Sequence, residues 1–219
     1  MLQTVERSPE SEGVDRVQLV TSRGAIAGRL QPAEGDRAIL WVFGAGGGLG
    51  GPAGGLYTRL GKQLRPHGVT SLELDYLRPG YLDECVSDVL VGLGYLESLG
   101  KSRTVLVGHS FGGAVVISAG AISPSVIAVA ALSSQTAGTA AVAELSPKPM
   151  IFVHGSADEV LPDRCSRDLH ARAREPREPK ELILYPGCRH GLDQCRESLD
   201  QDLTRWLERM FQLPATQPG

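Results

Sequence analysis

The feature that most constrains the fold of this chain is an alternation between short apolar runs and longer segments whose apolar residues recur at helical spacing. Continuous apolar runs occupy residues 38–44, 104–107, 126–132 and 150–153. Such runs are typical of strands that are buried on both faces of a parallel sheet. Between them, residues 82–99 place leucine, valine and cysteine side chains on one helical face. The alternation predicts a mainly parallel sheet with helices on both faces.

The start of the predicted sheet differs from its middle. Residues 17–22 and 25–31 are short apolar and β-branched runs separated by Arg23-Gly24, a tight-turn signal, so we expect an antiparallel hairpin there. Further strands are expected at residues 69–76 and 181–187. The predicted fold class is therefore α/β: a three-layer α/β/α sandwich around a mostly parallel, eight-stranded sheet with an N-terminal antiparallel hairpin.

Length and composition predict a single domain. With 219 residues, 42% of them hydrophobic, the chain can bury a substantial core. We expect residues 15–212 to form this domain, residues 1–14 to be a disordered N-terminal tail and residues 213–219 to be a C-terminal tail. The first 13 residues are polar and lack the apolar stretch of a signal peptide or a membrane anchor. This predicts a cytoplasmic protein without a membrane partner.

The charge pattern argues against nucleic acid as a partner. The formal net charge is -3, and no run of one sign forms a basic patch or an interaction tail. The sequence predicts no oligomeric state.

The four cysteines predict free thiols. Cys85, Cys165, Cys188 and Cys195 form no CxxC pair, and a chain of this size does not need a disulfide framework. A metal site built from Cys188, His190 and Cys195 is disfavoured, because zinc sites usually take close ligand pairs from two places. We therefore expect neither a metal nor a cofactor.

The stretch "GHSFGG" at residues 108–113 lies between an apolar strand and a helix of small residues. It matches G-x-S-x-G in the strand, turn and helix context that a nucleophilic serine requires. Gly108 and Gly112 leave room for a turn too tight for side chains, and the turn would present the Ser110 hydroxyl above the sheet. Alone the motif is a weak signal, because glycine-rich turns also bind phosphate or serve packing.

A serine nucleophile needs a base, and five histidines compete for that role. His67 ends a helix away from the predicted site, and His170 lies in a charged helix. His109 precedes Ser110 on the strand, so its side chain should point away. His154 closes a strand at the right edge, but an ordinary buried histidine would explain it equally well. His190 follows the last strand in the short loop "CRHGL" and is the best candidate.

The base in turn needs a carboxylate to orient it. Asp158 follows the strand that contains His154 and can reach a histidine in the next strand's loop. Asp163 and Asp193 are more simply helix N-caps. Asp75 also follows a strand but precedes the nucleophile in the chain.

The order Ser110, Asp158, His190 resembles that of the α/β-hydrolase superfamily. Across residues 17–211 the chain is similar to dienelactone-hydrolase-like proteins and small serine esterases. The resemblance implies a serine hydrolase of the carboxylesterase class that cleaves a carboxylic ester or thioester without a cofactor or metal. In the dienelactone hydrolases the usual nucleophile is cysteine, so Ser110 is a departure.

The resemblance also implies where an oxyanion hole would lie. The family places one donor after the third strand, where this chain has the glycine-rich stretch "FGAGGGLGGPAGG". By position we assign the two backbone N–H donors to Ala45 and Phe111. Relatives typically carry His-Gly where this chain has Phe43-Gly44, so a contact made by that histidine is lost. The alternative is a loop that needs glycine only for turning.

The connection at residues 133–148 is too short for a large cap over the site, which predicts an open cleft. Its rim would include the apolar side chains of Leu49, Leu56, Tyr76, Tyr81, Phe111 and Val160, each of which could equally be core. The alternative to an enzyme is a catalytically silent α/β-hydrolase domain that serves as a small-molecule receptor or an interaction scaffold.

Overall fold

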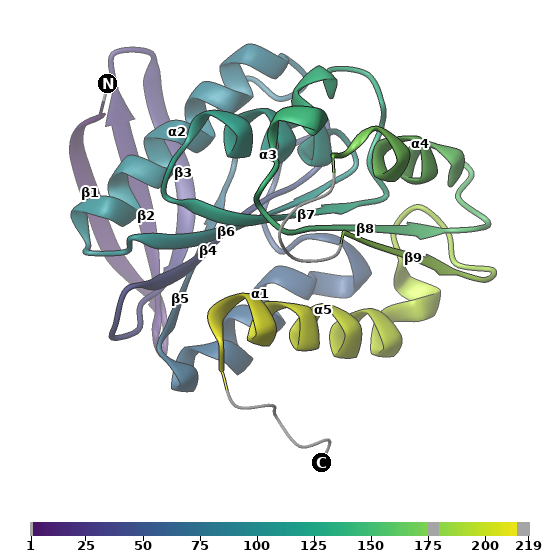
Figure 1. Cartoon of the computed structure of the whole chain (residues 1–219). Coiled ribbons are helices and arrows are strands. Elements are labelled where there is room, and N and C mark those ends of the chain that lie inside the picture. The colour runs from purple at the N-terminus through teal and green to yellow at the C-terminus, as the bar shows by residue number, and fades with distance from the viewer. Residues whose placement is uncertain (1, 175–179, 214–219) are drawn as a thin grey trace.

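The computed structural model describes residues 2–174 and 180–213 and shows a twisted sheet with helices on both faces (Figure 1). The nine strands lie in the order β1-β2-β3-β5-β4-β6-β7-β8-β9. In this order, every neighbouring pair from β5 to β9 is parallel. The pairs β1–β2, β2–β3 and β3–β5 are antiparallel. The strands are β1 (Leu2–Ser11), β2 (Val14–Thr21), β3 (Gly24–Gln31), β4 (Arg37–Val42), β5 (Val69–Leu74), β6 (Arg103–His109), β7 (Val126–Leu132), β8 (Met150–Gly155) and β9 (Glu181–Tyr185).

Helices α2, α3 and α4 lie on one side of the sheet, and α1 and α5 lie on the other (Figure 1). The first part of α1 has positive φ angles at Ala53, Gly54 and Gly55, so its regular helix begins near Leu56. The helices are α1 (Pro52–Leu64), α2 (Leu82–Ser98), α3 (Phe111–Ile122), α4 (Arg164–Arg172) and α5 (Arg196–Phe211), with short 3-10 helices η1 (Arg65–His67), η2 (Ala140–Glu144) and η3 (Asp193–Cys195).

Two hydrophobic cores lie on the two faces of the sheet, and alternation along the strands fills both. In β4, Leu40 packs into the core that α2 and α3 cover, while Ile39 and Trp41 pack into the core under α1 and α5. A continuous apolar run is needed because successive side chains point to opposite faces. The three-layer α/β/α sandwich predicted from the apolar runs is therefore confirmed.

The N-terminal residues correct the sequence prediction, because 2–11 form a ninth strand and not a disordered tail. β1 pairs with β2 through an antiparallel ladder whose register shifts near each end, between Leu2 and Thr4 and between Pro9 and Ser11. Its side chains are mostly exposed, so no apolar alternation marks it in the sequence. Ion pairs contribute to its attachment: Arg7 Nε donates to Asp15 at 2.6 Å, and Arg29 Nη2 donates to Glu10 at 2.8 Å.

A disulfide between Cys188 and Cys195 corrects the prediction that all four thiols are free. The two Cα atoms lie 5.8 Å apart, within the range that a disulfide can bridge. The spacing of seven residues did not predict this bond, because the distance between the two thiols depends on how the loop folds. Cys85 and Cys165 are free and buried. Two members of the disfavoured metal site, Cys188 and Cys195, are therefore bonded to each other.

Other expectations can be compared with the described residues. Between β7 and β8 the only helical element is the five-residue η2, in keeping with the predicted absence of a large cap. Within residues 2–174 and 180–213, no helix is both long and apolar enough to cross a bilayer. Leu213, the first residue of the predicted C-terminal tail, lies outside any helix or strand. Residues 214–219 of that tail lie outside the described part of the chain.

Candidate active site

Ser110 sits on a sharp turn between β6 and α3. Its backbone has φ 57° and ψ -121°, a strained combination for a residue with a side chain. The turn is held from both sides, because Ser110 N donates to Leu132 O at 2.8 Å and Gly113 N donates to Ser110 O at 3.0 Å. The strain is thus maintained by the neighbouring strand β7 and by the start of α3.

The glycines that flank Ser110 are required by backbone contacts. A Cβ atom on Gly108 would lie 2.1 Å from Gly112 O, and one on Gly112 would lie 2.3 Å from Phe43 O. Either substitution would force main-chain segments apart. The prediction that both positions need glycine for close approach is consistent with this geometry.

The structure brings Ser110, His190 and Asp158 together at the carboxyl ends of the strands. His190 Nε2 lies 3.0 Å from Ser110 Oγ, and His190 Nδ1 lies 2.7 Å from Asp158 Oδ2. The His190 side chain is 16% exposed, whereas the Asp158 side chain is fully buried. With hydrogen on Nδ1, the imidazole donates to Asp158 and offers its Nε2 lone pair to the Ser110 hydroxyl.

The Asp158 carboxylate is held in its charged form by hydrogen bonds. Burial raises its pKa, but this is outweighed by donation from Leu161 N, from the His190 ring and from Val160 N, so the pKa lies below its usual value. Both backbone N–H groups contact Oδ1 at 2.8 Å. A carboxylate that stays ionised can stabilise a positive charge on His190 during proton transfer.

The loop that carries His190 is fixed by its backbone. Cys188 O accepts a hydrogen bond from Ala157 N at 3.0 Å, which ties the loop to the Asp158 loop. His109 Nε2 lies 2.9 Å from His190 O, a contact in which the ring nitrogen donates. Burial lowers the pKa of His109 to about 4, so its ring is neutral near pH 7. The His109 ring also packs against the His190 ring, with 4.8 Å between their centroids, so His109 supports the loop that carries the candidate base.

The remaining candidate bases lie in other settings. His154 is fully buried; it contacts Ser166 Oγ at 2.7 Å and Asp158 Oδ2 at 3.1 Å, and no contact joins it to Ser110 within the described residues. His170 Nε2 reaches Lys180 O at 3.4 Å, and His67 ends η1.

The other candidate acids make different contacts from those expected. Asp163 stands at the N-terminus of α4, but its carboxylate pairs with Arg167 and makes no capping hydrogen bond. Asp193 begins η3, and α5 starts only after Cys195. Asp75 accepts a hydrogen bond from Gly48 N at 2.7 Å and so holds the glycine-rich loop. No pattern in the sequence indicated this supporting contact.

The glycine-rich loop lies directly beside Ser110. A Cβ atom on Gly44 would lie 3.5 Å from Ser110 Cβ and 3.9 Å from Ser110 Oγ, and Ala45 is the next residue along this loop. Residues 44–47 form a turn in which Gly47 N donates to Gly44 O at 3.0 Å. Phe111 is the first residue of α3, where backbone N–H groups lack partners within the helix. Phe111 thus directly follows Ser110, and Ala45 directly follows Gly44, the loop residue that approaches Ser110.

Side chains also fix the strand end that leads into this loop. Tyr57 Oη donates to Val42 O at 2.8 Å, and Tyr76 Oη donates to Phe43 O at 3.1 Å. Gly50 N donates to the buried Glu73 carboxylate at 2.6 Å. Main-chain carbonyls before the loop and N–H groups within it are thus both anchored.

Part of the predicted cleft rim belongs to the core. Leu56 is fully buried among the α1 and α5 side chains, so it is not a rim residue. Tyr76 and Phe111 are 7% exposed and meet edge to face at 6.1 Å. Tyr81 and Val160 are 57% and 62% exposed. Of the predicted rim, these two side chains are therefore exposed apolar groups.

Two hollows occur far from Ser110, where the strands begin. A cavity of about 530 Å³ is lined by the starts of β6, β7 and β9 with the end of α5, and a neighbouring one of about 420 Å³ lies between β9 and α5. In open parallel sheets, binding sites lie at the opposite, carboxyl ends of the strands. The hollows at the starts of the strands therefore lie at the opposite edge of the sheet from Ser110.

A sheet of this topology, with a serine on the strand-to-helix turn after β6, defines an α/β-hydrolase. The sequence profile of the dienelactone hydrolase family matches residues 54–209, which is more than half of the chain. The chain belongs to the dienelactone hydrolase family.

Individual relatives are distant. The uncharacterized protein YfhR of Escherichia coli is 29% identical, over 51% of this chain and 46% of that protein, so the chain spans about half the length of this curated relative. Est1E from Butyrivibrio proteoclasticus has a similar structure, with a TM-score of 0.74 and 17% identity over 90% of this chain and 99% of that one. Dienelactone hydrolase from Anabaena variabilis also has a TM-score of 0.74, with 16% identity over 94% and 99%. These structural similarities support the fold.

Proposed function

We propose that this protein is a serine hydrolase that cleaves a carboxylic ester or thioester through an acyl-enzyme on Ser110. The observation that carries the proposal is the unbroken series of contacts from Ser110 Oγ to His190 and on to Asp158, at 3.0 and 2.7 Å. A hydroxyl is a weak nucleophile until a base takes its proton, and this arrangement supplies the base and the group that orients it. Membership of a hydrolase family supports the same conclusion.

In the first half of the reaction, Ser110 Oγ attacks the acyl carbon while His190 Nε2 takes the hydroxyl proton. Asp158 holds the ring in the required tautomer and stabilises its positive charge. The tetrahedral intermediate places a negative oxygen near the backbone N–H groups of Ala45 and Phe111, which we assign as its donors. His190 then gives the proton to the leaving alcohol or thiol, and Ser110 keeps the acyl group.

In the second half, water replaces the leaving group. His190 takes a proton from this water, whose oxygen attacks the acyl carbon, and the proton then returns to Ser110 Oγ as the acid leaves. Every proton is moved by His190, so no metal or cofactor is needed for the cycle. The partner that the proposal requires is a small ester or thioester.

A fluorophosphonate probe tests the proposal, because it labels only a serine that a base activates. We expect labelling of the wild-type protein at Ser110 and none of Ser110→Ala, with His190→Ala strongly reduced. A series of p-nitrophenyl esters of increasing chain length would then bound the acyl group that the site accepts. Folded wild-type protein that neither reacts nor hydrolyses any of these esters would instead favour a silent receptor or scaffold.

The cytoplasmic location stays a prediction. It came from the polar N-terminus, whereas disulfides such as Cys188–Cys195 persist mainly in oxidising compartments. Fractionation of cells that express the full chain would decide between these two signals.

A further inference from the structure

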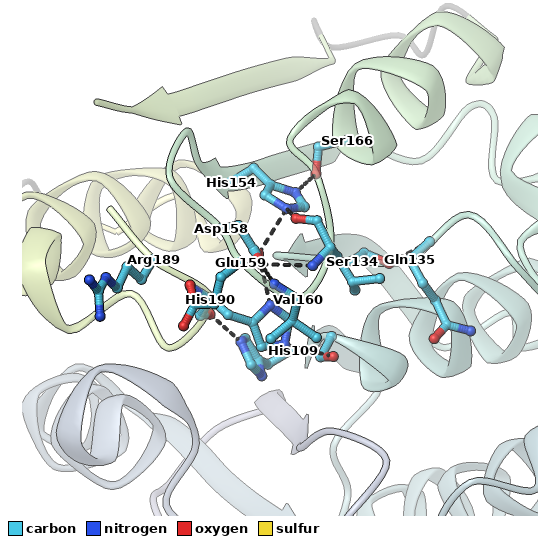
Figure 2. A network of polar contacts seen from close by, with 12 residues as sticks. His109, Ser134, Gln135, His154, Asp158, Glu159, Val160, Ser166, Arg189 and His190 are labelled. Atoms are coloured by element: carbon cyan, nitrogen blue, oxygen red, sulfur yellow. Dashed lines mark hydrogen bonds and ion pairs between the residues drawn. The ribbon is translucent and has the colours of Figure 1, made fainter. Parts of the chain in front are cut away.

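A second imidazole contacts the Asp158 carboxylate from the interior of the protein. His154 Nε2 lies 3.1 Å from Asp158 Oδ2, the same oxygen that receives His190 Nδ1 (Figure 2). We propose that His154 is a positioning residue that fixes Asp158 for its work on His190. This inference rests on the proposed function, because it assigns a role within the same reaction.

The number of donors around Asp158 is the first argument. A carboxylate can accept about four hydrogen bonds, two at each oxygen. Oδ1 accepts from Val160 N and Leu161 N, each at 2.8 Å. Oδ2 faces the ring nitrogens of His190 and His154. The Asp158 side chain is fully buried, so water cannot replace any of these donors without a change in structure.

The surroundings of His154 determine which of its nitrogens carries the hydrogen. Nε2 lies 3.0 Å from Leu161 O and 3.1 Å from Asp158 Oδ2, both of which can only accept. A lone pair on Nε2 would face two oxygens in a buried site, so the hydrogen belongs on Nε2 and is shared between them. Nδ1 then accepts the Ser166 hydroxyl, which lies 2.7 Å away. The neutral ring satisfies every contact.

The backbone explains why this ring can act as a fixed support. His154 belongs to β8 and is fully buried, and Ser166 belongs to α4 and is also fully buried. Its ring therefore cannot turn without losing the Ser166 and Leu161 contacts. Asp158, in contrast, follows the strand in an irregular loop. Through His154, the loop residue Asp158 is thus held by contacts to the strand β8 and the helix α4.

The support and the base approach Oδ2 together, which restrains rotation of the carboxylate about its last bond. If His154 were removed, His190 would be the only donor at Oδ2, and a small rotation of the carboxylate would move the imidazole relative to Ser110. Because proton transfer depends strongly on geometry, a shift well below 1 Å at Nε2 slows the reaction.

Two amide substitutions give a matched test. In His154→Gln the side-chain nitrogen can occupy the place of Nε2, whereas in His154→Asn the amide is too short and occupies the place of Nδ1. Both variants introduce a buried amide, so both are expected to lower the melting temperature. Only the Gln variant keeps a donor to Asp158. Besides Asp158, the charged or titratable side chains at His190 are Glu159, which accepts from the His190 backbone N–H, and His109, whose ring packs on the imidazole; neither is altered.

The readout is hydrolysis of p-nitrophenyl acetate, normalised to the sites that a fluorophosphonate titrates. For His154→Asn we expect kcat to fall by ~10-fold or more with KM within about twofold, the size of loss seen when an outer partner that orients an active-site group is removed. The acid limb of the kcat/KM profile should move to higher pH, because Oδ2 without this neutral donor attracts the imidazolium more strongly. His154→Gln should restore kcat to within about threefold of wild type.

The outcomes separate this inference from the function on which it rests. If the wild type is active and both variants keep its kcat and pH profile while only the melting temperature falls, His154 is a structural residue and the inference is wrong. Equal losses in Gln and Asn would also overturn it, since the donor would then be irrelevant. A wild type that is neither labelled nor active would overturn the proposed function itself, and with it the need for a positioned carboxylate.

Discussion

The two sides of the candidate active site are held in different ways. The acid–base side, residues 154–161 and 188–192, is held by buried side chains that hydrogen-bond one another. The oxyanion side, residues 43–51 and 75–81, presents main-chain groups, and its side chains bind the backbone of the loop. The acid–base side therefore depends on the identity of individual side chains, whereas the oxyanion side depends on the conformation of the backbone.

Because of this difference, substitutions on the two sides should affect activity differently. On the acid–base side the proposed mechanism uses atoms of the Asp158 and His190 side chains, so a change of one atom should remove the proposed chemistry. On the oxyanion side the proposed donors are backbone N–H groups, which every residue except proline carries. Substitutions there act through the position of the loop and should have smaller, graded effects.

The largest effect is expected from Asp158→Asn, which breaks the acid–base side. An amide in place of the carboxylate favours the wrong tautomer of His190, and we expect kcat for p-nitrophenyl acetate to fall by about 10⁴-fold. Asp163→Asn is the matched control, because Asp163 lies in the same connection but pairs with Arg167. Its activity should stay within about twofold of wild type. Activity of Asp158→Asn near the wild-type level would exclude Asp158 as the orienting acid.

A smaller effect is expected from Asp75→Ala, which loosens the oxyanion side. The variant loses the acceptor for Gly48 N and frees the loop that carries Ala45. Loss of a complete oxyanion donor costs about 10² to 10³ in kcat, so a displaced loop should cost roughly 10- to 100-fold, with KM nearly unchanged.

Asp75→Asn is the control for this variant, since its side-chain oxygen can still accept from Gly48 N. It should retain most of the activity. Equal and large losses in both variants would mean that the charge of Asp75 matters and not its hold on the loop.

The smallest effect is a pH dependence of stability at the junction of the two sides, where the His109 ring packs against Phe43 and His190. Burial lowers the pKa of His109 to about 4, whereas an unfolded histidine has a pKa of about 6.5. The neutral ring therefore contributes stability that is fully present above pH ~6.5 and is lost as the pH falls through about 4.

Within that window the slope from this one group is at most ~1.4 kcal/mol per pH unit. Urea unfolding at several pH values would measure it, with His109→Gln as a reference that cannot titrate but can still donate to His190 O. Parallel curves for the two proteins would show that His109 is not the group responsible.

The same division explains how much the sequence could predict. The central strands were predicted from their apolar runs, because burial on both faces leaves an unmistakable pattern. The approach of Ser110, Asp158 and His190 followed from their places after strands whose carboxyl ends meet at one edge. Their chemical roles stay predictions until they are tested.

What the sequence could not predict depends on contacts between distant segments. β1 has no buried face, so only its pairing with β2 and its ion pairs define it. The Cys188–Cys195 disulfide depends on how a loop turns, and the hold of Asp75 on Gly48 depends on two strands being neighbours. His154 was recognised as a buried histidine, but its contact with Asp158 cannot be read from a spacing of four residues in a loop.

The contacts around Gly108 and Gly112 bear on how this site could be changed. Three stretches of main chain touch there with no side chain between them: the end of β4, the end of β6 and the start of α3. The separation between Ser110 and the loop after β4 is therefore set by the thickness of the polypeptide backbone, which no substitution of a side chain elsewhere alters. Exposed residues such as Tyr81 and Val160 can thus be substituted while this spacing stays constant.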